Sequence, residues 1–235
     1  MIEIIVYELE KIRNNNIKKF YLYLFISIIL IILLVLFLFG KDFVSFICFG
    51  CFFTVLNLLL VIPIIQKSCS FEIKNSLFNV IKKIDEFQEF TINKYLRSSS
   101  IFRDVSVFLY PSSTNCYEED YLEIEYKNQK IELAECRIYK IESYYSEGKR
   151  RTKTVSLFNG ILIKIPKQLT KQNLVTNESY FIFSMPQDPN HIYVKIETKS
   201  LFLEFNIFRK ITEKDIKEKI EEINKVFSII REVVT

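Results

Sequence analysis

Two long uncharged runs dominate the hydrophobic pattern of this chain. The first covers residues 20–40, the second covers residues 43–66, and only Lys41 and Asp42 separate them. As a helix rising 1.5 Å per residue, the first run is about 31 Å long, which matches a hydrocarbon core of roughly 30 Å. Because lipid offers the backbone no hydrogen-bond partner, spanning segments of this kind must be helical. The pattern therefore predicts a transmembrane helical hairpin.

Two other interpretations of the runs fit the pattern less well. Two buried helices of a water-soluble protein would need apolar neighbours on every side of both helices. A cleavable signal peptide is disfavoured because the first run is too long and acids precede it. In addition, the single alanine of the chain, Ala134, allows no A-x-A cleavage site. We expect both runs to be spans of the mature protein.

The basic residues beside the two runs predict their orientation. Eight of them flank the outer ends of the runs: Lys11, Arg13, Lys18, Lys19, Lys67, Lys74, Lys82 and Lys83. The connection between the runs carries only Lys41. Since Lys and Arg are enriched in cytoplasmic flanks, both termini are expected in the cytoplasm. The predicted multi-pass protein of the inner (cell) membrane then has three parts: a cytoplasmic N-terminal helix (1–19), two transmembrane helices (20–66) and a cytoplasmic domain (67–235).

The pattern beyond residue 67 predicts an α+β domain. Apolar residues at helical spacing indicate a helix over residues 71–87. Alternating apolar and polar residues then predict six or seven strands, over residues 105–109, 122–126, 131–141, 152–165, 180–185, 191–198 and 201–208. A closing helix is expected to start at Thr212, a good N-cap, and to pack on the sheet or on a second copy of itself. The predicted fold is thus a transmembrane hairpin followed by a mostly antiparallel sheet with flanking helices.

Composition excludes several kinds of enzyme. The chain has 235 residues, 26% of them charged, and a formal net charge of +4, which does not by itself indicate a partner. Its four glycines are never closer than ten residues, so glycine-rich nucleotide loops and a G-x-S-x-G nucleophile elbow cannot occur. The single histidine, His191, excludes His-based metal motifs and is expected to face solvent at a turn.

The five cysteines do not form a metal-binding pattern. Cys48 and Cys51 lie inside the second run, where no further Cys or His could complete a site. Cys116 and Cys136 have no partners at the spacing of zinc ligands. The sequence therefore predicts no metal site and no cofactor.

Two groups of residues are candidate contact sites. A stripe of small and polar residues on the second run is expected to pack against the first run or a second copy: Gly50, Cys51, Thr54 and Asn57. A basic cluster in a predicted hairpin turn is either a solvated turn or a contact for anionic lipid headgroups: Lys149, Arg150, Arg151 and Lys153. The neighbouring acidic run at residues 118–120 indicates a surface of mixed charge. Nucleic acid is not favoured as a partner, because no basic helix or aromatic-rich basic surface supports it.

Three functional hypotheses follow from these features. The first is an integral membrane protein whose cytoplasmic domain is a binding or interaction module for a protein partner, another copy or a lipid headgroup. The second is a membrane-tethered hydrolase or transferase that uses carboxylates, which would need a pocket with two or more acids of raised pKa. The third is a subunit of an oligomeric membrane assembly.

Three short motifs resemble those of a bacterial two-span membrane family known as domain of unknown function 3137. Residues 120–126 (DYLEIEY) resemble a D-Y-I-x-G-x-Y strand, residues 131–136 (IELAEC) an F-S-E-L-like segment, and residues 158–160 (FNG) an F-K-G motif. Ile124 and Asn128 stand where that family has glycine. The resemblance implies the architecture and a membrane location, and it implies no catalytic residues.

Overall fold

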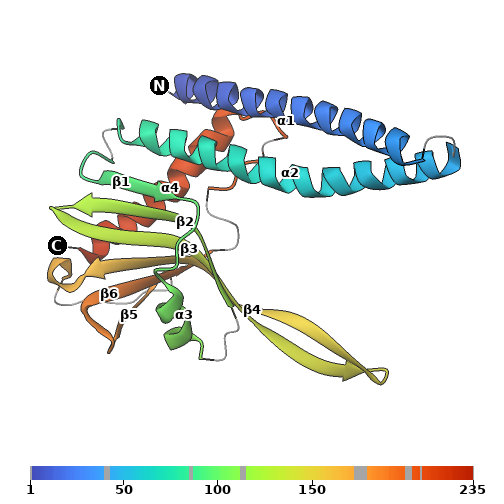
Figure 1. Cartoon of the computed structure of the whole chain (residues 1–235). Helices are drawn as coiled ribbons and strands as arrows, with labels where there is room; N and C mark the ends of the chain where they lie inside the picture. The colour runs from blue at the N-terminus through green and yellow to red at the C-terminus, as the bar shows by residue number, and fades with distance from the viewer. Residues whose placement is uncertain are drawn as a thin grey trace. The chain divides into compact units, whose positions relative to one another are not determined.

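The computed structural model divides the chain into two compact units (Figure 1). Unit 1 comprises Met1–Leu77 with Phe205–Lys217, and unit 2 comprises Phe78–Glu204 with Glu218–Thr235. The structure describes residues 2–39, 43–84, 87–111, 115–171, 179–198, 203–206 and 208–234; side chains at 34–51, 53, 54, 57, 58 and 61 lie outside this description. The predicted α+β class, with an antiparallel sheet and flanking helices, is confirmed.

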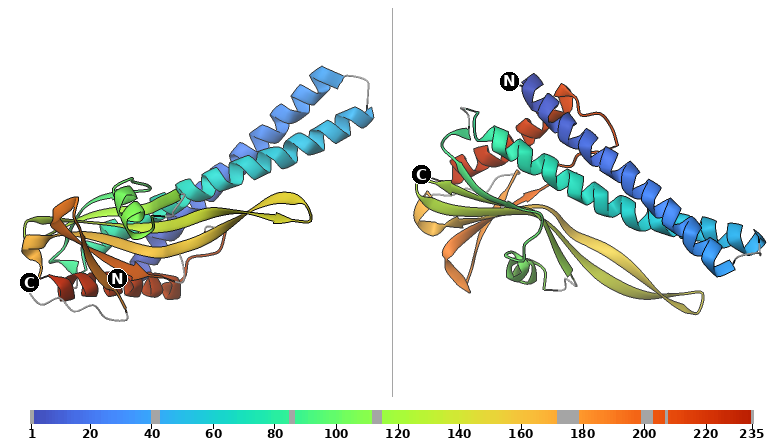
Figure 2. Two further views of the ribbon diagram at one scale, coloured as in Figure 1. Left: turned by 90° about the horizontal axis from the view of Figure 1, so that it is seen from below. Right: turned by 45° about the horizontal axis from the view of Figure 1, so that its top comes forward.

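Unit 1 is built on two long helices, α1 (Ile2–Phe39) and α2 (Phe43–Ile81), which run antiparallel (Figures 1 and 2). Asn16 on α1 donates a hydrogen bond from its side-chain amide to the Glu72 carboxylate on α2 at 2.6 Å. Ile5, Leu9 and Ile73 are buried, whereas Ile4 and Tyr7 are 65% and 70% exposed, so only part of the apolar positions of the predicted N-terminal helix packs against protein.

One helix of the described residues is long and apolar enough to cross a bilayer, α1 over Ile2–Leu33. Most of its apolar side chains are not covered by protein; Phe25 is 62% exposed and Leu30 is 59% exposed. This arrangement supports association with a membrane. The predicted second span is helical, but the two-span hairpin itself is not shown by the part of the chain that is described.

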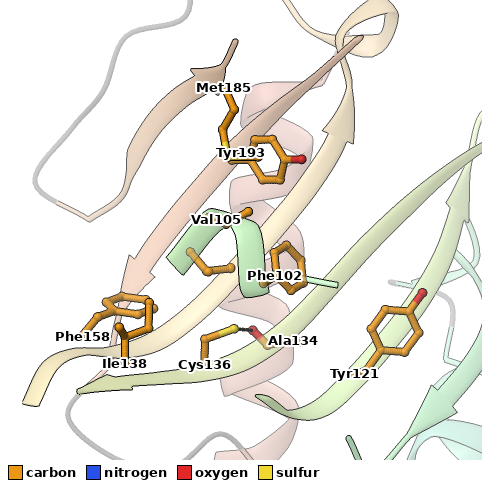
Figure 3. Close-up of a cluster of buried hydrophobic side chains, with 10 residues drawn as sticks. Phe102, Val105, Tyr121, Ala134, Cys136, Ile138, Phe158, Met185 and Tyr193 are labelled. Atoms are coloured by element: carbon orange, nitrogen blue, oxygen red, sulfur yellow. Dashed lines mark hydrogen bonds between the residues drawn. The ribbon is translucent and has the colours of Figure 1, made fainter. Parts of the chain in front are cut away.

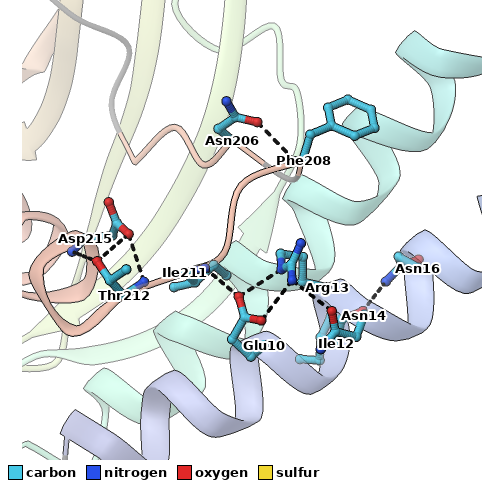
Figure 4. Close-up of polar contacts among 10 residues, drawn as sticks. All are labelled: Glu10, Ile12, Arg13, Asn14, Asn16, Asn206, Phe208, Ile211, Thr212 and Asp215. Carbon is cyan, nitrogen blue, oxygen red and sulfur yellow. Dashed lines mark hydrogen bonds and ion pairs between the residues drawn. The ribbon is translucent and has the colours of Figure 1, made fainter.

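The segment before the last helix is held by polar contacts in unit 1 (Figure 4). The Glu10 carboxylate accepts hydrogen bonds from the Arg13 guanidinium at 2.8 and 2.9 Å and from the Ile211 backbone amide. The described residues of 201–208 form no strand, so the prediction of a strand there is wrong. Their backbone groups are used instead in turns, as when the Phe208 amide donates to the Asn206 side chain at 3.0 Å.

Unit 2 contains a six-stranded antiparallel sheet in the order β1-β2-β3-β4-β6-β5. The strands are β1 (Thr91–Leu96), β2 (Asn115–Tyr126), β3 (Gln129–Ser146), β4 (Lys149–Pro166), β5 (Phe181–Met185) and β6 (Asp188–Glu197). The turns Lys127–Asn128 and Glu147–Gly148 have positive φ at both central residues, from 50° to 74°. Such turns match the right-handed twist of the strands that they join.

Two elements of unit 2 differ from the sequence-based expectation. Residues 105–109, predicted as a strand, belong to the helix α3 (Arg103–Leu109), in which Val105 and Ser106 are buried and Val107 is 58% exposed. Phe102 and Val105 both face the core, and their separation of three residues is typical of a helix. The segment is too short for its pattern of apolar residues to distinguish a helix from a strand. Strand β1 was not predicted, because a bulge between Ile92 and Lys94 places its buried residues Ile92 and Tyr95 three apart.

The two faces of the sheet carry separate cores. On one face α3 contributes Phe102 and Val105 to a cluster with Ala134, Cys136 and Leu162 (Figure 3). On the other face Leu133, Ile163 and Val194 lie side by side in register on β3, β4 and β6. The last helix, α4 (Glu213–Val233), lies behind the sheet in Figure 3. The centroid of its Phe227 ring lies 5.5 Å from that of Phe87 and 4.6 Å from that of Phe90.

Candidate functional site

A two-stranded arm extends beyond the sheet of unit 2 (Figures 1 and 2). Strand β2 pairs with β3 only as far as Tyr139, and β6 pairs with β4 only from Gly160 onward. Between these limits β3 and β4 continue alone to the Glu147–Gly148 turn. We define the arm as residues 140–155. Within the described strands, neither β2 nor β6 pairs with it, so both edges of the arm lack a strand neighbour, and most of its side chains on both faces are exposed.

The register of the arm separates the predicted basic cluster into two faces. Ser146 pairs with Lys149, Tyr144 with Arg151 and Glu142 with Lys153, and paired residues of neighbouring strands share a face. Lys149, Arg151 and Lys153 therefore lie on one face together with Tyr144. We refer to these four residues as the basic face. Arg150 pairs with Tyr145 and lies on the opposite face, so the structure brings together three of the four predicted residues.

Local ion pairs neutralise only part of the charge on the basic face. The Arg151 guanidinium lies 3.1 Å from the Glu147 carboxylate of the turn. Glu142 is bound by Lys140 at 2.5 Å, and this contact, together with the charges of Lys140 and Lys153, lowers the pKa of the Glu142 carboxyl. Four basic residues thus share this side of the arm with two acids, which leaves a surplus of positive charge.

Exposed tyrosines accompany these charges on both faces. Tyr144 is 46% exposed on the basic face, and Tyr145 is 80% exposed on the face of Arg150. Tyrosine combines an apolar ring with a polar hydroxyl and is enriched where a protein surface meets a lipid headgroup region. The sequence-based interpretation considered only the charges; the strand alternation of 140–146 was the signal that could have located the tyrosines beside them.

A second group of charged residues surrounds Asp188 at the start of β6. The Asp188 carboxylate accepts hydrogen bonds from the Tyr193 hydroxyl at 2.6 Å, from His191 Nδ1 at 2.6 Å and from the Lys164 ammonium at 2.9 Å. Partial burial works against ionisation of Asp188. The three donors outweigh it, however, and hold the pKa of this carboxyl well below its ordinary value.

His191 is half-buried in this group, so the prediction of a solvent-facing turn residue is wrong. The turn consists of Pro186 and Gln187 alone, and β6 already begins at Asp188. The pairing of β5 with β6 then shifts between Phe183 and Met185, which allows Asp188 to meet both His191 and Tyr193. Sequence spacing gives no sign of such an irregularity.

A pocket of about 410 Å³ lies beside this group and is lined by Lys130, Glu132, Lys164, Lys167 and His191, among others. Two of its three lysines are already compensated. Lys130 lies 2.9 Å from both Glu123 and Glu132, and Lys164 lies 2.9 Å from Asp188. The pocket therefore has little uncompensated charge to select an ionic ligand, and the arm is the better candidate site.

The other predicted contact site lies outside the described side chains. Gly50, Cys51, Thr54 and Asn57 fall within the helical backbone of α2, but the description does not extend to their side chains. Their role in helix packing stays a prediction.

No known protein family, characterised protein or solved structure matches this chain. The resemblance to domain of unknown function 3137 accordingly stays a prediction.

Proposed function

We propose that this chain is an integral membrane protein whose sheet domain is a binding module, and that the arm binds anionic lipid headgroups through its basic face. The observation that carries the proposal is the joint placement of Lys149, Arg151, Lys153 and Tyr144 on one side of a projecting two-stranded ribbon. Cationic side chains attract the headgroups, and a tyrosine ring suits the boundary between headgroups and acyl chains.

The magnitude of the attraction is sufficient for a tethered domain. An uncompensated basic residue near an anionic leaflet contributes about 1 kcal/mol, so the surplus of two positive charges contributes about 2 kcal/mol, or roughly thirtyfold in the bound fraction. A single contact of this strength would be weak for a freely diffusing protein. Binding to a surface costs a freely diffusing protein translational freedom. If α1 already holds the chain at the membrane, most of this cost does not arise for the arm.

A single tryptophan offers a direct test of this contact, since the chain contains none. Full-length Tyr144→Trp protein would be placed in bilayer discs of phosphatidylcholine, with and without phosphatidylglycerol. We expect a blue shift of the emission only in the discs with phosphatidylglycerol. About 1 M salt should abolish the shift, since the Debye length then falls to about 3 Å.

The neighbouring residue supplies the matched control. Tyr145→Trp places the probe one position away on the opposite face and should show no lipid-dependent shift. In the Tyr144→Trp protein, K149Q/R151Q/K153Q should abolish the shift, whereas K82Q/K83Q, which removes exposed charges outside the arm, should leave it intact. Identical emission from both probes in every disc would reject the lipid contact.

We further propose the two-span topology with both termini in the cytoplasm. Exposed apolar side chains on α2, including Phe52 (61%), Leu59 (67%) and Ile64 (66%), support a second lipid-facing helix. Fusion of green fluorescent protein to the C-terminus, in a bacterial host, should give fluorescent cells, and fusion of periplasmic alkaline phosphatase at the same place should give an inactive enzyme. The reverse pattern would contradict the proposed orientation.

The carboxylate-based enzyme receives no comparable support. Burial raises the pKa of the Glu118 carboxyl. The pocket beside it, which also includes Ser99, Arg103 and Cys116, is lined by no second acid. General acid–base catalysis by paired carboxylates needs both groups at one site.

A further inference from the structure

Two cysteines meet on the face of the sheet that α3 covers. Register pairs Cys116 of β2 with Ile138 of β3, and Glu118 of β2 with Cys136 of β3. Cys116 and Cys136 are therefore diagonal neighbours on adjacent strands, and the nearby Cys136 thiol is the largest influence that lowers the pKa of Cys116. Both are free thiols. Their spacing of 20 residues in the sequence gave no sign of this contact.

The two thiols differ in access. Cys116 is half-buried and lines a pocket of about 310 Å³ with Ser99, Arg103, Ser106 and Asn115, among others. Cys136 is completely buried in the core cluster between Ala134 and Ile138 (Figure 3). A small reagent in the pocket can therefore reach Cys116 first, and Cys136 only through Cys116.

The surroundings favour the thiolate form of Cys116. The neighbouring Cys136 thiol, the Ser106 hydroxyl and the Arg103 charge each favour the charged form of its sulfur. Together they lower the pKa of Cys116 against the opposing effects of burial and Glu118. With Cys116 as a thiol, Cys136 donates to the Ala134 carbonyl at 3.7 Å and the Ser106 hydroxyl donates to the Arg103 carbonyl at 2.7 Å. Both protons can turn to a thiolate on Cys116, because a charged acceptor is preferred. Burial raises the pKa of Cys136.

We infer that Cys116 is an oxidative modification site that reacts with hydroperoxides, and that Cys136 resolves the product to an intramolecular disulfide. The Cys116 thiolate attacks one peroxide oxygen, the O–O bond breaks, and the leaving oxygen takes a proton to become an alcohol or water. This leaves a sulfenic acid on Cys116. The Cys136 sulfur then attacks the Cys116 sulfur, the S–O bond breaks, and the hydroxide leaves with the Cys136 proton as water. Two thiols lose two electrons, and the peroxide gains them.

The inference is independent of the lipid contact, because the pocket is formed by α3, β2 and the residues before α3 rather than by the arm. Diagonal neighbours lie about 7–8 Å apart, so forming the disulfide would draw β2 and β3 together locally and alter the wall of the pocket, while the order of the sheet stays the same. Cys69 provides a contrast within the same chain. It is completely buried on α2, and burial, with a smaller effect of Glu72, raises its pKa to about 11.

The test uses the full-length chain with Cys48, Cys51 and Cys69 replaced by serine, so that only the two thiols in question remain. Hydrogen peroxide should lower the mass of the monomer by about 2 Da, and dithiothreitol should restore it. With Cys136→Ser added, the product should gain about 16 Da and be trapped by dimedone on Cys116. With Cys116→Ser added, neither change should occur, because Cys136 is inaccessible. Cys136→Ala serves as a second variant if the serine is not tolerated in the core.

Three results would overturn the inference. The first is dimedone labelling of Cys136 in the Cys116→Ser protein. The second is a rate of peroxide oxidation in the folded chain that does not exceed the rate in denaturant. We expect the folded chain to react about tenfold faster. The third is oxidation that gives only disulfide-linked dimers. Ser106→Ala should slow the reaction of Cys116 while Lys94→Gln, an exposed control on β1, leaves it unchanged.

Discussion

Three consecutive acids on β2 take three different structural roles. Glu118 is buried and accepts hydrogen bonds from the Ser99 hydroxyl and from the Phe102 amide at 2.9 Å, which anchors the start of α3. Glu119 pairs with Arg137 on the opposite face. Asp120 is buried, accepts a hydrogen bond from Tyr95 at 2.6 Å, and has a φ of 50° at a bulge. The surface of mixed charge expected at these residues is therefore formed by Glu119 with Arg137, while Glu118 and Asp120 are buried.

Gly160 is a position where a side chain cannot be accommodated. A Cβ atom there would lie 2.0 Å from the Ile196 carbonyl oxygen of β6 and 2.9 Å from the Phe158 ring. We expect Gly160→Ala to lower the stability of unit 2 by about 1–3 kcal/mol, measured by thermal unfolding in detergent. Gly148→Ala meets no atom within 4 Å and is strained only by its φ of 74°, so its loss should be about 1 kcal/mol. A larger loss for Gly148→Ala would contradict this reasoning.

Asp188 should make stability dependent on pH. Its three donors lower the pKa of the folded carboxyl, so it contributes stability above the unfolded pKa of about 3.9, and that contribution is lost as the pH falls through the folded pKa. We expect Asp188→Asn to lower stability at pH 7 by about 1–2 kcal/mol and to have less effect in acid. Asp104→Asn, at an exposed position, is the control. A deficit that grows towards low pH would contradict the assignment.

At the scale of elements, β3 and β4 perform two tasks with one pair of strands. Their inner halves bury Leu133, Ala134, Leu162 and Ile163 between two cores, whereas their outer halves form the arm. The change coincides with the points where β2 and β6 stop pairing, at Tyr139 and Gly160. The length of the strands beyond their neighbours, rather than any special motif, therefore creates the candidate site.

The start of α4 is fixed by a reciprocal cap. The Asp215 amide donates to the Thr212 hydroxyl at 3.3 Å, and the Thr212 amide donates to the Asp215 carboxylate at 2.8 Å. The prediction of Thr212 as N-cap is confirmed. We expect Thr212→Ala to cost about 1 kcal/mol in thermal unfolding, and Thr212→Ser, which keeps the hydroxyl, to cost much less. Equal losses would show that the hydroxyl does not act as a cap.

At the scale of the whole molecule, the chain combines an apolar helical unit with a sheet unit that carries both proposed sites. The exposed aliphatic side chains are concentrated on α1 and α2. The arm and both pockets belong to unit 2. This separation means that the proposed lipid contact and the proposed thiol chemistry can be tested by substitutions that leave the apolar helices unchanged.

Removal of the arm tests this separation. Replacing residues 141–154 by Asn-Gly, which favours a two-residue turn, would connect Lys140 to Val155, a directly paired position. Because most arm side chains are exposed, we expect thermal unfolding to change by less than about 1 kcal/mol. If the arm contacts anionic lipid, discs with phosphatidylglycerol should protect unit 2 of the full-length protein from protease, and high salt should remove this protection. The shortened protein should not be protected. A collapse of stability would assign the arm a structural role instead.

The sequence alone determined those features that depend on local composition. The uncharged run of α1, the cap at Thr212 and the turns of the long hairpins were predictable, because each is decided by residues within a few positions of one another. The α+β class followed from the same alternation. The short α3 and the bulged β1 were not predictable, since a segment with two buried residues fits helix and strand equally well.

Only the tertiary structure decided which residues act together. Strand register sorted Lys149, Arg151 and Lys153 from Arg150, placed Cys116 beside Cys136, and gathered Lys164, His191 and Tyr193 around Asp188. These groups join residues from different strands or across a bulge, where a shift of one position would exchange the faces of the sheet. Pairing geometry, which local composition does not encode, therefore determines the candidate sites of this protein.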